Sequence, residues 1–417
     1  MTTAVRTPPD ATQRIAHAPS NRVREAVERF EEWLTRSGEL SYDFQTFYAG
    51  RYGRFAKALY YRRRTVGVCA VAPIIFCEAF VPSARRFFWI PQRFPIADAH
   101  YAMGFARLYR HTKDSRHLRR AVHFLEVLLQ TACRGASGLG WGYPFDWVTI
   151  DGTIPRQTPL ITTLPYVYEA FEAVHEVAPE DRWLQTMRSI AEHAARDYRN
   201  YETGAGAATC TYTPLASDRG LVVNANAYRA FLLTKAARDL REPAYLLAAE
   251  PNLKFVLDAQ NADGSWYYAM DGRREFIDHF HTCFVLKALV KIGQLTGRID
   301  CKRAVESGLK YYFSHLFTED GLPRPFSRPP RLIVYRQELY DYAECINLLS
   351  LIEAPSKRAL DLLSTTVNDV LGRWQRADGS FRSRKLLIGW DNVPMHRWAQ
   401  AQLFRSLSGL LPGIPGA

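Results

Sequence analysis

The chain has 417 residues, of which 47% are hydrophobic and 13% are aromatic. This composition excludes a disordered or fibrous protein and supplies enough apolar surface for two or three average domains or one large repeat. The formal net charge of +12 favours an anionic partner: an acidic polysaccharide, a nucleotide or diphosphate, nucleic acid, or an anionic membrane surface. An Arg-rich solvated surface with no such partner is the alternative.

The chain begins with a polar lead. Residues 1–20 contain no apolar stretch of the kind found in a secretion signal, so we expect a disordered segment. Residues 21–39 place Val23, Val27 and Phe30 at helical spacing, which predicts an amphipathic helix. The seven cysteines are scattered and form no CxxC pair, which is typical of reduced thiols and predicts a cytoplasmic protein.

Residues 41–96 are aromatic and Arg-rich without a regular period, and we expect an arm or cap of short helices there. Within this segment, residues 65–82 (TVGVCAVAPIIFCEAFVP) approach the length of a membrane span and follow three consecutive arginines. Pro73 and Glu78 interrupt the apolar run, so a buried core helix is the preferred interpretation. A membrane span or a peripheral membrane anchor is the alternative.

The rest of the chain is periodic. Between successive repeats lie amphipathic helices at 114–130, 179–198, 243–260, 300–315 and 355–374. The starts of successive helices of a second type lie about 56 to 63 residues apart. This interval accommodates a helical hairpin and a turn, which indicates a repeat protein. The second helix type is rich in small residues and begins near Ala97, Leu160, Val223, His279, Glu338 and Met395.

Six small-residue helices have only five amphipathic partners, and the helix at 21–39 is available as the sixth. Closing the ring in this way buries the apolar ends that an open solenoid has to cap. We therefore predict an all-α fold, an α/α toroid of about six helical hairpins formed by residues 21–417, in preference to an open array. Aromatic turns such as 138–147 (GLGWGYPFDW) and 264–272 (GSWYYAMDG) would lie with the inner-helix starts around one cleft.

Two clusters at inner-helix starts are candidates for catalysis. The first is Asp278, His279 and His281, in which the aspartate either caps the helix or acts with an imidazole as a general base. The two histidines lie two positions apart, so one should face the cleft and the other should lie across its rim.

The second cluster is Tyr340, Asp341 and Glu344. Residues three apart share a helix face, and two carboxylates held close together have pKa values that separate into an acid and a base. Solvated carboxylates at a helix mouth are the alternative interpretation.

Further polar and aromatic residues recur at inner-helix starts and in the turns. Capping alone would need one such residue per helix, and arginine offers a two-pronged donor that suits a substrate carboxylate. The candidate substrate-binding residues are Asp98, His100, Trp141, Tyr143, Asn224, Asn226, Trp266, Tyr335, Arg336, Trp390, Asp391, His396 and Arg397.

Two turns carry a family resemblance. Residues 260–266 (QNADGSW) and 375–381 (QRADGSF) resemble the Q-x-x-D-G-S-W repeat of squalene-cyclase-like proteins, which braces helix ends in that family. Together with the periodicity after about Ala97, they make the chain similar to the α/α-toroid superfamilies. These comprise six-hairpin glycosidase-like proteins, uronate-processing lyases and epimerases, and the terpene cyclase and protein prenyltransferase barrels.

A third match concerns zinc. Residues 279–283 (HFHTC) resemble the Y-H-T-C run of the prenyltransferase β-subunit, which would make His281 a zinc ligand. That family takes two more ligands from an Asp-x-Cys pair one repeat earlier, where this chain has Asn224 and Asn226, and carboxamides are poor zinc ligands. The aspartate clusters of terpene cyclases do not occur either. We therefore predict no metal and no cofactor, and the carbohydrate branch of the resemblance is preferred.

The preferred branch implies a carbohydrate-active enzyme of the kind that accompanies bacterial polysaccharide biosynthesis, with an anionic carbohydrate as its partner. Hydrolysis would use Asp341 or Glu344 as the acid, with Asp278 or Asp391 as the partner carboxylate. Lyase or epimerase chemistry would use Tyr340 or His281 as base or acid. Arg397 or an asparagine would neutralise a substrate carboxylate.

Other classes are disfavoured or remain alternatives. The chain has no Walker loop, G-x-S-x-G elbow or HExxH motif, and no recognisable nucleic-acid-binding module. Isoprenoid chemistry in the same toroid and a non-catalytic scaffold that binds glycan or protein remain alternatives. The expected location is cytoplasmic, with peripheral membrane association left open.

Overall fold

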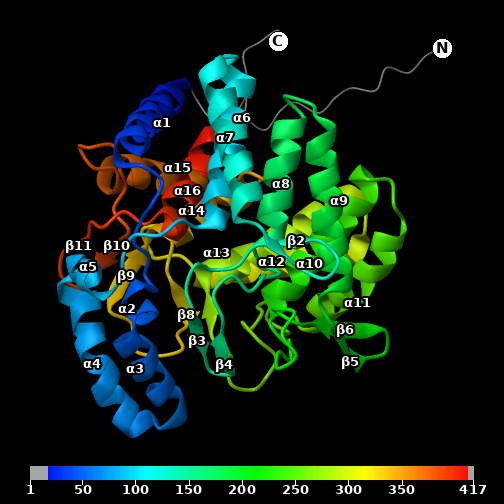
Figure 1. The fold of residues 1–417 in the computed structure, drawn as a ribbon. Coiled ribbons are helices and arrows are strands. Elements are labelled where there is room, and N and C mark those ends of the chain that lie inside the picture. The colour runs from blue at the N-terminus through cyan, green and yellow to red at the C-terminus, as the bar shows by residue number, and fades with distance from the viewer. Residues whose placement is uncertain (1–16, 412–417) are drawn as a thin grey trace.

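The computed structural model describes residues 17–411, which form two concentric layers of helices closed into a ring (Figure 1). Each inner helix packs against the next, and α16 packs against α6 to close the ring. The all-α toroid predicted from the sequence is therefore confirmed. The inner layer consists of α6 (Pro95–Thr112), α8 (Leu164–His175), α10 (Val223–Asp239), α12 (His279–Thr296), α14 (Leu339–Leu349) and α16 (Ala401–Ser408).

The outer layer also has six members within the described residues. Helix α1 is the sixth, as the repeat count predicted, and it packs against α16 and η3. It begins at His17, so the last residues of the expected lead are helical, while residues 1–16 lie outside the described part. The outer helices are α1 (His17–Ser37), α7 (Ser115–Thr131), α9 (Asp181–Arg196), α11 (Ala244–Asp258), α13 (Ile299–His315) and α15 (Lys357–Asp369), which continues into η3 (Val370–Trp374).

The two layers differ in sequence because they differ in burial. Inner helix α10 is buried on every side from residue 223 to residue 237, which explains its many small residues. Outer helix α9 buries Trp183, Met187 and Ile190 on one face and exposes Arg182 and Arg188 on the other. The amphipathic pattern is thus the signature of the outer ring.

The two Asp-Gly-Ser turns tie neighbouring outer helices together. In each turn the aspartate side chain accepts hydrogen bonds from the backbone N–H and the hydroxyl of the serine two positions later. The glutamine that opens each turn then donates to the next outer helix: Gln260 to the Ala304 carbonyl of α13 at 2.9 Å, and Gln375 to the Ala26 carbonyl of α1 at 2.8 Å. Helix α1 therefore follows α15 in the ring as α13 follows α11.

Short antiparallel strand pairs lie at the inner-helix starts. Strand β7 directly precedes α12 and pairs with β8, and β9 directly precedes α14 and pairs with β10, so a later segment of chain fixes each helix start. The other pairs are β1 with β2, β3 with β4, β5 with β6 and β10 with β11. The strands are β1 (Cys133–Arg134), β2 (Leu139–Gly140), β3 (Trp147–Thr149), β4 (Gly152–Ile154), β5 (Asn200–Gly204), β6 (Ala207–Cys210), β7 (Ile277–Asp278), β8 (Phe326–Arg328), β9 (Tyr335–Glu338), β10 (Arg384–Leu386) and β11 (Trp390–Asp391).

The predicted cap is a set of short helices that projects from the ring beside β3 and β9 (Figure 1). The interpretation of residues 65–82 as a buried core helix is wrong. Helix α4 does form there, with Pro73 inside it, but it buries only Gly67, Ile74, Glu78 and Ala79, because α3 covers one of its faces and leaves the rest uncovered. The cap comprises α2 (Thr46–Ala49), α3 (Arg51–Arg62), α4 (Arg64–Phe80), η2 (Pro82–Ala84) and α5 (Arg85–Phe88).

Candidate active site

An aspartate and a histidine form a pair at the start of α12. Asp278 is the N-cap residue, and its Oδ1 accepts the backbone N–H of His281 at 2.9 Å. Its other oxygen, Oδ2, lies 2.6 Å from His281 Nδ1. One carboxylate therefore caps the helix and orients the imidazole at the same time. The capping and catalytic interpretations of Asp278 are compatible in this geometry.

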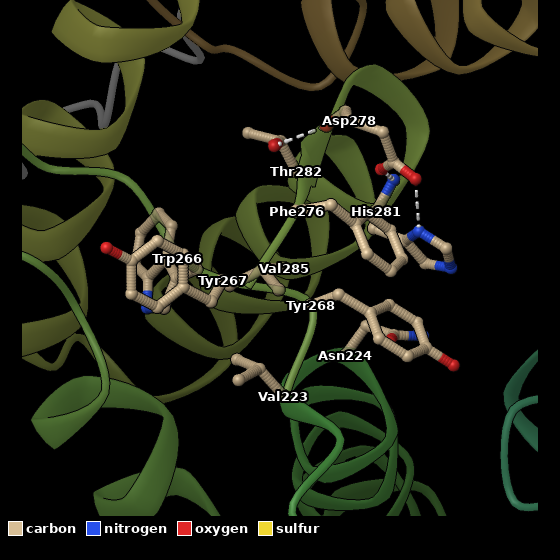
Figure 2. A pocket seen from close by; sticks show the side chains of 10 residues that line it. All are labelled: Val223, Asn224, Trp266, Tyr267, Tyr268, Phe276, Asp278, His281, Thr282 and Val285. Atoms are coloured by element: carbon tan, nitrogen blue, oxygen red, sulfur yellow. Dashed lines mark hydrogen bonds and ion pairs between the residues drawn. The ribbon is translucent and has the colours of Figure 1, made fainter. Parts of the chain in front are cut away.

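His281 lines a small pocket that opens to solvent. Figure 2 shows its ring between the Asp278 carboxylate and the Tyr268 ring, with Nε2 directed away from Asp278. The Tyr268 and His281 ring centroids lie 4.6 Å apart in a T-shaped arrangement. Within residues 17–411, Nε2 has no hydrogen-bond partner, so it is available to a ligand. Phe276, Trp266 and Asn224 complete this part of the wall.

Tyrosines and a tryptophan extend the wall away from His281. Burial raises the pKa of the Tyr212 hydroxyl well above its usual value, and the nearby hydroxyls of Tyr143 and Tyr268 raise it further. The Trp398 ring packs on Tyr340 in a tilted arrangement, with centroids 4.5 Å apart. The mouth of the ring is therefore lined by flat rings and neutral hydroxyls, the surface that a sugar uses for stacking and hydrogen bonding.

A buried carboxyl cluster lies beside this pair at the start of α14. Neither oxygen of Asp341 has a hydrogen-bond partner in the described structure, and the residue is 1% exposed. Burial raises its pKa well above the usual range, and the charges of Glu338 and Asp278 raise it further. Its surroundings therefore favour the protonated form of Asp341, which suits a proton donor.

Glu338 and Asp341 repeat the spacing of the first pair. Glu338 is the N-cap residue of α14 as Asp278 is of α12, and Asp341 lies three positions later, as His281 does. Glu338 makes no capping bond; its carboxylate accepts from Arg384 and from Trp398 Nε1. The ring symmetry thus brings a histidine and an aspartic acid to equivalent places on neighbouring helices.

Glu344 lies one turn further along α14, among the buried side chains between the inner helices, a region we call the bore of the ring. Its carboxylate pairs with the buried Lys287 ammonium. Similar pairs fill the bore: burial would raise the pKa of Glu169, but Lys291 and Arg405 outweigh it and hold the value at about 2. These carboxylates are neutralised within the protein. The sequence placed Glu344 beside Asp341 as an acid–base pair, whereas the structure gives Glu344 a cationic partner instead.

Several predicted site residues are engaged inside the protein. His279 is fully buried, with Nδ1 3.1 Å from a backbone carbonyl and Nε2 2.8 Å from a tyrosine hydroxyl of α13. Burial lowers the pKa of His279 to about 3 and that of His396 to about 4, so both are neutral. Trp141 and Asn226 bond to buried backbone groups. Of the two α12 histidines, only His281 lies in the pocket, so the expectation that the other lies across the rim is wrong.

Charged candidates elsewhere are paired over long sequence distances. Arg397 donates to both oxygens of a carboxylate, Asp43, at 2.9 and 2.5 Å, and to the Tyr143 hydroxyl at 3.1 Å. Asp391 lies 2.7 Å from an arginine of the cap, with both side chains fully buried. Asp98 is held by an arginine at 3.0 Å, and although that charge opposes it, burial raises the pKa of Asp98 to about 7.

The remaining candidates are divided between the mouth, the bore and the surface. His100 lies in the bore, where its ring centroid is 4.5 Å from that of Tyr166. Tyr335 lies beneath an arginine, and Arg336 is exposed on the same strand. Trp390 packs edge to face on an outer-ring tryptophan, 5.1 Å between centroids, away from His281's pocket.

Sequence reasoning missed several residues of the mouth. The missed residues contribute aromatic rings, hydroxyls or charge, and apart from Tyr268, which lies in the predicted aromatic turn 264–272, no motif marks them. The one usable signal was the repeat itself, because aligning the inner helices by their caps pairs Asp278 with Glu338. The missed residues are Phe44, Tyr212, Tyr268, Phe276, Glu338, Arg384 and Trp398. Within residues 17–411, no three His, Cys, Asp or Glu side chains gather as ligands of a metal ion would.

The fold is similar to solved structures of carbohydrate-active enzymes. Unsaturated glucuronyl hydrolase from Bacillus sp. GL1 aligns over 93% of this chain and 96% of its own, with a TM-score of 0.59 and 12% identity. Cellobiose 2-epimerase from Bacillus thermoamylovorans B4167 aligns over 76% and 87%, with a TM-score of 0.59 and 11% identity. The GH76A alpha-1,6-mannanase from Salegentibacter sp. HEL1_6 aligns over 77% and 91%, with a TM-score of 0.56 and 10% identity.

No protein-family model and no curated protein sequence matches the chain. At 10 to 12% identity the structural likeness shows the fold alone, an α/α toroid.

Proposed function

We propose that the protein is a carbohydrate-active enzyme that moves a proton beside the carbonyl group of a sugar, as an epimerase does. The observation that carries this proposal is the Asp278–His281 pair, which leaves His281 Nε2 free in an aromatic pocket. The Nδ1–H of His281 donates to Asp278, which fixes the neutral tautomer with Nε2 as the basic atom. The carbohydrate-active enzymes of the same fold support the choice of a sugar.

The chemistry follows from this geometry. A reducing sugar in its open-chain form has an acidic C–H next to the carbonyl carbon. His281 Nε2 takes that proton, and the Asp278 carboxylate stabilises the imidazolium that forms. The sugar then carries an enediolate. Return of the proton to the face it left restores the sugar, and delivery of a proton to the opposite face of the same carbon gives the epimer, with no net change in redox state. Asp278 is in this scheme a positioning residue, because it acts through His281.

We further propose that the substrate is a neutral sugar, which revises the expectation of an acidic one. The arginines near the mouth are already paired: Arg397 with Asp43, Arg384 with both Glu78 and Glu338, and Arg274 with a carboxylate at 2.6 Å. A substrate carboxylate would have to displace one of these partners. Tyrosine hydroxyls and aromatic faces, in contrast, match a neutral glycan.

The test is isotope exchange. The protein is incubated in D2O with neutral reducing disaccharides, starting with cellobiose and mannobiose, and NMR follows deuterium at the carbon next to the carbonyl. We expect exchange with at least one sugar and a loss of about 10²- to 10⁴-fold in the His281→Gln variant. His123→Gln, half-exposed on α7, is the matched control and should exchange at the wild-type rate. Equal exchange by wild type and His281→Gln would refute the assignment.

Hydrolysis is the second candidate, because Asp341 is a buried carboxyl with a raised pKa and so has the protonation state of a general acid. Against it, both oxygens of Asp278 are engaged by His281, which leaves no free carboxylate at the pocket to activate water. Release of new reducing ends from oligosaccharides distinguishes the two reactions. Hydrolysis predicts release that Asp341→Asn abolishes, with Asp361→Asn on the exposed face of α15 as the control.

We also propose that the protein acts in the cytoplasm in polysaccharide biosynthesis. All seven cysteines are free thiols, which supports a reducing compartment. Cell fractionation tests the location: recovery of the protein in an oxidising, extracytoplasmic fraction would contradict it. Loss of a cell's polysaccharide on deletion of the gene tests the biosynthetic role, and an unchanged polysaccharide would contradict that role.

A further inference from the structure

The cap carries an uncovered apolar surface. Helices α3 and α4 pack against each other around a small core of their own, formed by Phe47, Tyr48, Ala56 and Ile74 and separate from the core of the ring. Outside that core, six large apolar side chains on the hairpin and on the segment after it are each more than half exposed. We call them the hairpin patch: Phe55, Val66, Phe76, Phe80, Phe87 and Ile90. Several large apolar side chains exposed on one short segment mark a candidate interaction surface.

The same segment is strongly basic. Residues 44–94 contain nine Lys and Arg and one acidic residue, Glu78, which is buried and neutralised by Arg384 at 2.6 Å. Five of the arginines are exposed, and within residues 17–411 none of the five pairs with a carboxylate. We call them the hairpin arginines: Arg51, Arg62, Arg63, Arg64 and Arg86. In the described structure the cap thus carries exposed positive charge with no acidic side chain beside it, whereas the arginines of the mouth are paired.

The shape of the segment is that of a surface anchor. In the described part of the chain, no single helix is long and apolar enough to cross a bilayer. Helix α4 together with the η2 and α5 segment has the length and composition of a span, but the two are bent by 119°. A bend of this size turns the chain back to the side from which it came. A segment that enters a membrane from one side and leaves on the same side follows such a path.

We propose that the cap docks the protein on an anionic lipid membrane, with the hairpin patch among the acyl chains and the hairpin arginines at the phosphates. Anionic headgroups match the sign of the unpaired charge, and apolar and basic groups on one short segment are the usual pair of signals for peripheral binding. A second copy of this chain would bring the same positive charge against the patch and be repelled. In this proposal the anionic partner that the net positive charge of the sequence predicts is the membrane surface.

The proposal is tested with the full-length protein and lipid vesicles. Flotation is compared for vesicles of phosphatidylcholine alone and vesicles containing about 30 mol% phosphatidylglycerol, at low and at high salt. We expect wild type to bind the anionic vesicles, with binding at least about tenfold weaker on neutral vesicles and at high salt. The triple variant Arg62→Glu, Arg63→Glu, Arg64→Glu and the double variant Phe76→Asp, Phe87→Asp should each lose at least about tenfold.

Matched controls lie on the ring. Leu247→Asp changes a side chain that is 79% exposed on α11. A triple change of Arg24, Arg119 and Arg303 to Glu changes the net charge by the same amount as the hairpin triple variant, but away from the cap. Both controls should bind like wild type, and unchanged circular dichroism shows that the variants fold. No flotation of wild type, or equal losses in the controls, overturns the proposal. So does sedimentation that shows a dimer which only the hairpin variants dissociate, because the occupant of the patch is then a second copy.

Discussion

Asp341 and Glu344 lie one turn apart on α14 and have opposite surroundings. Asp341, at the mouth of the ring, is buried without a hydrogen-bond partner and beside two other carboxyl groups. Glu344, in the bore, is just as buried but pairs with Lys287. The same helix thus gives one carboxyl group a cationic partner at one of its oxygens and leaves both oxygens of the other without a partner in the described structure. Such a difference over one turn indicates that the bore serves stability and the mouth serves chemistry.

The distinction extends around the ring. In the bore, Lys235 of α10 reaches a carboxylate of the neighbouring helix α8, and Lys291 of α12 reaches another carboxylate of α8, which is not adjacent to α12 in the ring. Charge pairs therefore join inner helices that are far apart in sequence. At the mouth, His281 and Asp341 occupy equivalent helix positions, and each has an atom without a partner. The variants below test whether the bore and the mouth differ in energy as they do in geometry.

The largest effect is expected from Glu344→Gln. This change leaves the Lys287 ammonium, whose side chain is 6% exposed, in the bore without a counter-ion. Breaking a buried pair from one side typically costs about 3–5 kcal/mol, a large share of the stability of a typical domain. Urea unfolding measures the loss. The double variant Lys287→Met, Glu344→Gln removes both charges and should recover most of it. A single variant within about 1 kcal/mol of wild type would show that the pair does not brace the ring.

The opposite sign is expected from Asp341→Asn. The amide replaces an ionisable group whose charged form is disfavoured by burial, and we expect the free energy of unfolding to rise by about 1–3 kcal/mol at pH 8 while any acid catalysis is lost. The gain should depend on pH. Below the pKa of an unfolded aspartate, near 4, the residue is protonated in both states and the variant has no advantage.

Above that pH the unfolded wild type ionises while the folded protein retains its proton, because the folded pKa of Asp341 is raised. Wild type therefore loses stability relative to the variant as the pH rises towards the folded pKa. Thermal unfolding of both proteins from pH 4 to pH 8 measures the difference. A gap that is constant with pH, or that closes as the pH rises, would contradict the assignment. Asp361→Asn is the control and should be neutral at every pH.

Much of the fold was predictable because a repeat records it many times. The period of about 60 residues placed all six inner helices, and the missing sixth outer partner identified α1. The Gln375 turn then behaves towards α1 as the Gln260 turn behaves towards α13. Local spacing and repeat counting were sufficient here because each hairpin contacts mainly its neighbours.

The site was less predictable because long-range partners decide what each polar residue does. Residues 390–397 read as one recognition cluster, but Arg397 is neutralised by Asp43 and Asp391 by Arg85, each more than 300 positions earlier. His279 and His281 are equivalent in sequence spacing, and only the position of α13 makes one of them structural. Composition likewise shows that residues 65–82 are apolar, but not whether another layer covers them.

The smallest effect on stability is expected from Asp278→Asn, and it separates the two roles of that residue. Asparagine caps a helix about as well as aspartate, so the free energy of unfolding should change by less than about 0.5 kcal/mol. The amide can no longer hold the imidazolium of His281 by charge, so the proton-transfer rate should fall by about tenfold or more, and its pH profile should shift. Alanine at the same position should lose both stability and rate. If the asparagine variant keeps the wild-type rate and profile, Asp278 only caps α12, and the mouth has no assembled proton-transfer pair.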